Sequence, residues 1–200
     1  PDGLQCQSAL ADLLERSGRM DEALPLRKAL AAQKGAGAMN LLALAKVERE
    51  LGLPDWESHF AAARAVDPED PAPLILLGEW EAGQGKWESA ILHYEAVLDM
   101  DPGNLLALIQ MGITLSGAKE LSKAQGFLEQ ALQINPNLYQ LQLQLGFVAD
   151  AQGQYQQAAA HFKRATELGP GRRQAWRRYG SDLLRIGRHR LALVAFQQAA

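Results

Sequence analysis

Residues 133–138 read Gln-Ile-Asn-Pro-Asn-Leu, and a similar phrase centred on a proline recurs along the chain. The prolines of these phrases recur at one fixed interval and are Pro68, Pro102, Pro136 and Pro170. A fixed interval of this length indicates a chain built from copies of one structural unit. Each copy then packs on its neighbours, so the array offers an extended surface rather than one globular core.

Other residues repeat at the same interval. Glycines recur at Gly78, Gly112, Gly146 and Gly180. Alanines recur at Ala90, Ala124, Ala158 and Ala192, and a large residue follows each alanine at Tyr94, Leu128, Phe162 and Phe196. A second set of glycines lies between these two groups at Gly85, Gly153 and Gly187.

This pattern resembles the tetratricopeptide repeat (TPR), W-x2-L-G-x2-Y followed by A-x3-F, A and P. Trp176-x2-Tyr179-Gly180 and Ala192-x3-Phe196 are close matches. The resemblance implies an all-α, right-handed α-solenoid of about six helix-turn-helix units with helices of about 12–15 residues. It also implies one array over residues 1–200, with repeats at approximately 4–36, 37–70, 71–104, 105–138, 139–172 and 173–200.

Each recurring position has a physical reason. A glycine inside a helix costs about 1 kcal/mol relative to alanine, so its recurrence predicts a second helix too close for a side chain. The recurring alanines are expected to be the small face of that helix. The second glycine set marks the turn within a repeat, and each proline ends the second helix because its ring blocks continuation.

The repeat weakens towards the N-terminus. Segment 37–70 lacks the glycine of the first helix, and Trp56 stands at the alanine position, so altered packing is expected there. Segment 4–36 is one residue out of phase, and Pro1 falls where the proline of a preceding repeat belongs. The chain starts without Met and stops inside an apolar phrase at Ala200, so we expect a fragment whose last repeat is truncated.

The stretch Gln140–Leu145 alternates Gln and Leu, which taken alone is typical of a β-strand. The fixed interval of the repeat favours a helix instead, because Leu141, Leu145 and Val148 also lie on one helical face.

Composition narrows the class of function. The net charge of −3 gives no reason to expect nucleic acid as a partner. No apolar run approaches the roughly 18–20 residues that span a bilayer. Cys6 is the only cysteine, so an intrachain disulfide is impossible, which slightly favours the cytoplasm and leaves the periplasm open.

Candidate catalytic and metal-binding residues are few. His59, His93 and His161 occupy one repeat position, but equivalent helices lie about 8–10 Å apart, too far for two ligands of one zinc ion. Segments 99–104 and 83–87 depart from calcium-loop and phosphate-loop patterns. We expect no enzyme, no cofactor and no metal within these 200 residues.

In TPR proteins the first helices of successive repeats line a concave groove that binds a protein or peptide. The resemblance therefore implies an apolar strip with glutamine as its polar element. Its expected residues are Ile75, Glu79, Leu106, Ile109, Gln110, Ile113, Gln140, Leu143, Gln144, Phe147 and Asp150. The alternative is that several of these side chains only cover neighbouring helices. The carboxylate clamp of chaperone-binding TPRs is missing, because residues such as Ile75 and Gln110 stand at its positions.

The last repeat carries seven arginines and one acidic residue within 171–200. The proposed basic patch is Arg173, Arg177, Arg178 and Arg185. Guanidinium groups pair with carboxylates and phosphates, so an acidic peptide, a phosphate or a polyanion is one interpretation. A solvated charged face, or contacts to a following repeat, is the other. The truncated repeat also predicts an apolar end that self-associates or frays near 189–200.

The sequence thus predicts a protein–protein interaction scaffold or adaptor. The alternative is a TPR arm of a larger enzyme, or of a bacterial secretion or polysaccharide-export machine, which presents substrate or recruits partners.

Overall fold

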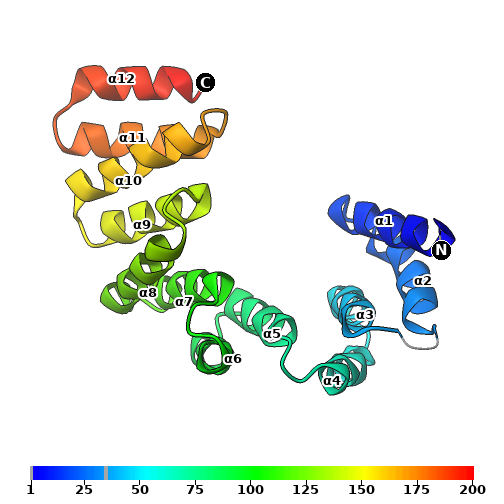
Figure 1. Ribbon diagram of the computed structural model, residues 1–200. Helices are drawn as coiled ribbons and strands as arrows, with labels where there is room; N and C mark the ends of the chain where they lie inside the picture. Colours follow the sequence, from blue (N-terminus) through cyan, green and yellow to red (C-terminus); the bar gives the residue numbers. More distant parts are fainter. Residues whose placement is uncertain (1, 34–35) are drawn as a thin grey trace. The chain divides into compact units, whose positions relative to one another are not determined.

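The computed structural model describes residues 2–33 and 36–200. Over these residues the chain forms twelve α-helices and no strand, which confirms the all-α class (Figure 1). The helices are α1 (Asp2–Arg16), α2 (Met20–Ala31), α3 (Ala38–Glu50), α4 (Trp56–Val66), α5 (Ala72–Gly83), α6 (Trp87–Met100), α7 (Leu105–Gly117), α8 (Leu121–Ile134), α9 (Tyr139–Ala151), α10 (Tyr155–Leu168), α11 (Arg173–Arg185) and α12 (His189–Gln198). Pro1, proposed to belong to a preceding repeat, lies outside the described residues.

The contacts divide the chain into two compact units, Pro1–Pro73 (unit 1) and Leu74–Ala200 (unit 2), and each is described by itself. In unit 1, α2 packs on α1 and α3, and α4 packs on α3. In unit 2, each helix from α7 to α12 packs on the helix before it. The prediction of a single array over residues 1–200 stays a prediction.

A left-handed residue ends the first helix of every pair. These residues have φ between 68° and 76° and are Gly18, Gly52, Gly85, Lys119, Gly153 and Gly187. The following amide closes a Schellman-type turn on the helix, as Gln154 N does by donating to Ala149 O at 2.9 Å. Lys119 was not identified from the sequence, because the recurring turn position was read from glycines alone.

The mid-helix glycines do mark close helix packing, as predicted. A β-carbon built on Gly146 would lie 2.5 Å from the ring of Phe162, and one on Gly78 would lie 2.6 Å from Tyr94. The alanines of the second helices are fully buried, but the atoms nearest the glycines belong mainly to the large side chain four residues later. The glycine therefore makes room for a ring or a leucine, in addition to a close helix.

The left-handed residues also correct the register of unit 1. In unit 2 the mid-helix glycine lies seven residues before the left-handed turn residue. In unit 1 the residues seven positions before the turn residues Gly18 and Gly52 are Ala11 and Ala45. Both alanines are buried, with exposures of 0% and 2%. The small residue is therefore present in unit 1 as alanine, and the shift of one residue lies between Gly52 and Gly85.

The prolines follow the second helices, as predicted. Helix α6 ends at Met100 two residues before Pro102, and α8 ends at Ile134 two residues before Pro136. The residue before each proline is extended, with φ of −140° at Asp101 and −138° at Asn135. The Asp101 carboxylate accepts a hydrogen bond from Gly103 N at 3.0 Å, which stabilises the turn.

Helix α4 shows the altered packing expected around Trp56. It has 11 residues and starts at Trp56, whereas α6 has 14 and starts at Trp87, three residues before its alanine. Trp56 is half-buried, and its ring packs edge-to-face with the Phe60 ring, with the two ring centroids 6.4 Å apart. The shortened start follows a turn that contains Pro54.

The alternating Gln-Leu stretch is helical, as predicted, and lies within α9. Leu141, Leu143 and Leu145 are all at most 3% exposed, so this helix is buried on more than one side. Within the described residues, no helix combines the length and apolar character needed to cross a bilayer.

Candidate partner-binding surface

The strip predicted for the groove lies on α5, α7 and α9 of unit 2 and is only partly accessible. Ile75, Ile109 and Leu143 are 6%, 6% and 3% exposed, so the expectation that they line an open groove is wrong. They belong to core clusters between successive helices. The alternative interpretation, that some of the strip covers neighbouring helices, applies to these three residues.

The rest of the strip reaches the surface. Leu106 is 49% exposed, and Glu79 and Gln140 are exposed. The remaining members are half-buried and are Gln110, Ile113, Gln144, Phe147 and Asp150. The accessible strip therefore pairs one exposed leucine with glutamine and glutamate side chains.

Two helices of the strip are joined by a polar contact. The Gln110 amide on α7 donates a hydrogen bond to the Glu79 carboxylate on α5. Part of the polar capacity of the strip is thus used within unit 2, whereas no hydrogen bond of the Gln140 or Gln144 side chain is found among the described residues. These two glutamines keep both donors and acceptors for a ligand.

The basic patch divides into two pairs of arginines. Arg178 stacks over the Phe147 ring, with its guanidinium carbon 5.0 Å from the ring centroid. Arg185 lies 4.7 Å from the Tyr155 centroid and forms an ion pair with Asp150. Both arginines therefore form contacts that hold α11 against the preceding helix pair, α9 and α10.

Asp182, which sequence reasoning missed, is a buried carboxylate in this contact region. It is 1% exposed, and its Oδ1 lies 3.4 Å from Arg185 Nη1. Burial, reinforced by the nearby charge of Asp150, raises the pKa of Asp182 to about 6, against the opposing charges of Arg185 and Arg178. Its only signal in the sequence is that it is the one acidic residue among seven arginines.

Arg173 and Arg177 have no ion pair or hydrogen-bonding side chain as partner in the described part of the chain. Both are exposed and line a depression of about 540 Å³ between α11 and the end of α12. The other lining residues are Gln174, Arg178, Ser181 and Ala199. Ser181 Oγ donates to the Arg177 carbonyl at 3.0 Å, so its hydroxyl oxygen can still accept.

The neighbouring helix α12 exposes apolar side chains. Leu193 is 61% exposed, Val194 51% and Phe196 36%. The prediction that residues 189–200 self-associate or fray stays a prediction, and the adjacent face of α11 is basic.

The three recurring histidines each contact a side chain of the first helix in their own pair. His59 Nδ1 lies 2.7 Å from Glu48, and His93 Nε2 lies 3.2 Å from Glu81. His161 Nδ1 lies 2.9 Å from the Gln142 amide oxygen, and burial lowers the pKa of His161. Among the described residues no three potential ligands gather around one point.

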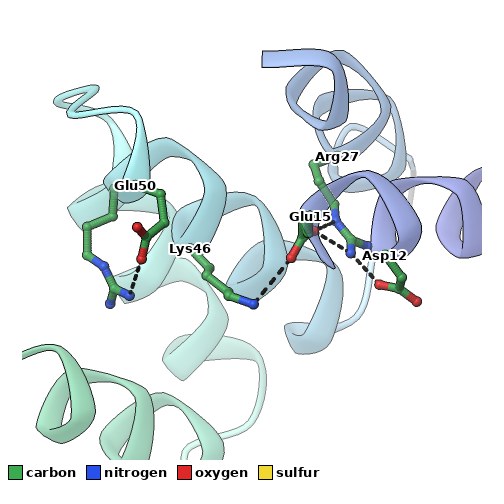
Figure 2. A network of polar contacts seen from close by, with 6 residues as sticks. Asp12, Glu15, Arg27, Lys46 and Glu50 are labelled. Carbon is green, nitrogen blue, oxygen red and sulfur yellow. Dashed lines mark hydrogen bonds and ion pairs between the residues drawn. The ribbon is translucent and has the colours of Figure 1, made fainter. Parts of the chain in front are cut away.

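Unit 1 contains a buried charge network that the sequence reading overlooked (Figure 2). Arg27 on α2 is 5% exposed at its side chain and pairs with Asp12 at 2.5 Å and Glu15 at 2.5 Å on α1. Lys46 on α3 adds a 3.3 Å contact to the second Glu15 oxygen. Counted from its turn residue Gly18, Arg27 occupies the position that Phe162 has in unit 2. A charged residue therefore replaces the large apolar one, and two carboxylates satisfy it.

Three family models, each described as Tetratricopeptide repeat, match residues 57–104, 81–145 and 139–182. Together they extend from residue 57 to residue 182, more than half of the chain. No curated protein matches the chain by sequence.

Solved structures share the fold. A thermophilic TPR protein of Thermus thermophilus, TTC0263, is 24% identical with a TM-score of 0.72, covering 90% of this chain and 99% of that one. PilF of Pseudomonas aeruginosa is 15% identical with a TM-score of 0.76, and the match covers 98% of this chain and 89% of PilF. PilW, a type IV pilus biogenesis factor, is 16% identical with a TM-score of 0.73, and the match covers 100% of this chain and 90% of PilW. At these identities the likeness concerns the fold alone.

Proposed function

Because this chain belongs to the tetratricopeptide repeat family, we propose that it is a non-catalytic scaffold or adaptor that binds a protein or peptide. The observation that carries the proposal is the accessible strip on α5, α7 and α9. It joins the exposed Leu106 to Gln140 and Gln144, whose side-chain amides are available to a ligand.

A strip of this kind suits an extended or helical peptide. Leu106 offers an apolar contact, and the glutamines can donate to and accept from the peptide backbone. The half-buried Phe147 ring is already held in place by Phe162, with the two ring centroids 5.4 Å apart, and by Arg178, so it needs little ordering on binding.

Site-specific photo-crosslinking tests the proposal. A photoreactive residue at Leu106 should capture a partner from a lysate of the source organism. The matched control is Leu92 on the second helix α6, which is apolar and 64% exposed but lies outside the strip. The purified partner should then bind the chain and lose about tenfold in affinity with Gln144→Ala.

Two results would count against the proposal. One is equal capture from Leu106 and Leu92, which indicates non-specific contact. The other is turnover of a substrate by the purified chain at catalytic rates.

A second candidate is an arm of a larger enzyme or of a bacterial secretion or polysaccharide-export machine. Its support is the architecture that the chain shares with PilW, and this is an analogy of fold. Capture of a component of such a machine through Leu106 would favour this candidate over a free adaptor.

A further inference from the structure

Unit 1 contains a pocket at the place where α2, α3 and α4 meet. Its volume is about 320 Å³, and ligand pockets in proteins start at about this size. Its apolar wall consists of Ala31 and Ala32 at the end of α2 and of Leu41 and Leu44 on α3. Every lining residue belongs to unit 1, whereas the strip on α5, α7 and α9 belongs to unit 2. A ligand of this pocket is therefore independent of the proposed function.

The pocket is open because part of its wall is built from small side chains. Counted from the left-handed turn residue of its own helix pair, Ala31 occupies the position that Leu98 and Leu132 have in unit 2. Both leucines pack against the core cluster of unit 2. The methyl group of Ala31 therefore leaves space in unit 1 that a leucine side chain fills in two later pairs.

One wall of the pocket carries a buried carboxylate. Glu48 is 1% exposed, and its Oε2 accepts from His59 Nδ1 at 2.7 Å, because an ionised carboxylate can only accept. A carboxylate has about four acceptor sites, and within the described part of unit 1 this is the one hydrogen bond found at the Glu48 side chain. Its Oε1 therefore keeps its acceptor capacity. Burial of a carboxylate with so few partners is costly, so the pocket favours a cation that adds a hydrogen bond.

The rim of the pocket carries two further charges. Asp55, directly before α4, and Lys28 on α2 both line the pocket, and both are exposed. Among residues 2–33 and 36–73, neither side chain is found in an ion pair. Together with Glu48 they give two carboxylates and one ammonium, so the pocket has an excess of negative charge while His59 is neutral.

We infer that this pocket binds an aliphatic primary ammonium group, which donates to Glu48 Oε1 while its alkyl chain lies along Ala31, Leu41 and Leu44. Such a chain packs on apolar surface and leaves its charged end to a polar partner. The lysine side chain of a partner protein and a free alkylamine share this chemistry. The test below separates these two sources.

The hydrogen bond to His59 decides between an ammonium and a guanidinium. A guanidinium pairs best with both oxygens of one carboxylate, and at Glu48 one oxygen already accepts from the His59 ring. An ammonium is a compact charge that needs a single oxygen, and its other protons remain for Asp55 and water. The pocket therefore favours lysine-like over arginine-like ligands.

The test is an NMR titration of the full chain, labelled with ¹⁵N, at pH 7 and constant ionic strength. The probe is n-butylammonium chloride, which should give saturable shifts of backbone amides in segments 41–48 and 55–59. Uncharged n-butanol should bind about tenfold more weakly or worse, because it brings no charge to Glu48. The n-butylguanidinium ion should bind about threefold more weakly than n-butylammonium.

A blocked amino acid separates the two sources of the ammonium. Nα-acetyl-lysine N-methylamide carries the same alkylammonium on a peptide backbone. If the ligand is a lysine of a partner protein, this compound should bind at least as tightly as n-butylammonium. Weaker binding of the blocked lysine would mean that the pocket takes a free alkylamine.

Three variants test the contacts. Glu48→Gln should weaken n-butylammonium about tenfold or more, since it removes the charge and keeps the shape. The matched control is Glu81→Gln, because Glu81 has the same position before its turn residue and also contacts a histidine, but lies outside the pocket. This control should change the affinity less than about twofold. Ala31→Leu should abolish binding by filling the pocket while Glu48 remains. Circular dichroism checks that the variants keep their helicity.

Several results would overturn the inference. Equal binding of n-butanol would mean an apolar cavity in which charge plays no part, and tighter binding of n-butylguanidinium would contradict the single-oxygen contact. Equal loss in Glu48→Gln and Glu81→Gln would mean general electrostatic attraction. Binding that persists in Ala31→Leu would place the ligand elsewhere. A gain of tenfold or more in Lys28→Ala would mean that the chain's own Lys28 closes the pocket.

Discussion

Arg185 on α11 forms an ion pair with Asp150 on α9, one helix pair earlier, and also lies 3.4 Å from Asp182 on its own helix. One guanidinium is thus shared by two carboxylates, of which Asp182 is almost fully buried. We expect this arrangement to make the stability of the junction between α9 and α11 depend on pH.

The free energy of unfolding should fall as the pH rises from about 4 to about 6. The folded state raises the pKa of Asp182 from 3.8 to about 6, so it favours the protonated acid. The corresponding stabilisation is complete below the unfolded value and is lost above the folded one, an effect of up to about 3 kcal/mol. Asp182→Asn should remove most of this slope and raise stability at pH 7, as measured by urea unfolding from pH 4 to pH 7. A slope that is unchanged in Asp182→Asn would refute the assignment.

Lys119→Gly should stabilise unit 2 by about 0.5–1 kcal/mol. Lys119 has φ of 69° in a turn where the other pairs have glycine, and L-residues pay a steric cost in this region. The reverse change, Gly153→Ala at φ of 76°, should destabilise by about 1 kcal/mol. Thermal unfolding of the two variants beside the wild type measures both effects, and a lower midpoint for Lys119→Gly would contradict the expectation.

Gly146→Ala should cost about 1–3 kcal/mol, because the added carbon meets the Phe162 ring at 2.5 Å in a fully buried site. The control is Gly126→Ala in the middle of α8, where nothing lies within 4 Å of the new carbon. There the change should stabilise by up to about 1 kcal/mol through helix propensity. Denaturant unfolding should give opposite signs for the two variants, and equal signs would show that the ring contact does not matter.

Arg27→Ala should lower the stability of unit 1 by about 3–5 kcal/mol, since it leaves the Glu15 carboxylate, 9% exposed, without its main partner. Arg19→Ala, which removes an exposed and solvent-screened pair with Glu22, should leave the stability nearly unchanged. Hydrogen exchange of amides in α1, α2 and α3 localises the effect to unit 1. The double variant Arg27→Leu/Glu15→Leu should recover much of the loss, and its failure to do so would argue against charge burial as the cause.

The sequence predicted the helix class and the helix ends of unit 2 because Pro102, Pro136 and Gly153 impose their backbone geometry locally. It did not reveal Lys119, because a left-handed turn favours glycine but accepts other residues. It detected the one-residue shift of segment 4–36 but not that the shift lies after Gly52, nor that alanine replaces glycine at Ala11 and Ala45. Both become visible only from backbone angles.

The candidate site was harder to predict than the fold. Ile75, Ile109 and Leu143 lie on helices that face the expected groove, but the crossing of the next helix decides whether a side chain is covered. Arg178 and Arg185 look equivalent to Arg173 and Arg177 in the sequence. The structure distinguishes them because Phe147 lies beside Arg178 and Asp150 lies beside Arg185.

The contact between each mid-helix glycine and its ring has a consequence for folding kinetics. Every such contact joins two positions within a single helix pair, as Gly146 and Phe162 show. Closing so short a loop costs little entropy, and chains dominated by local contacts fold quickly. Each pair of unit 2 can therefore nucleate by itself and then extend the structure to its neighbours.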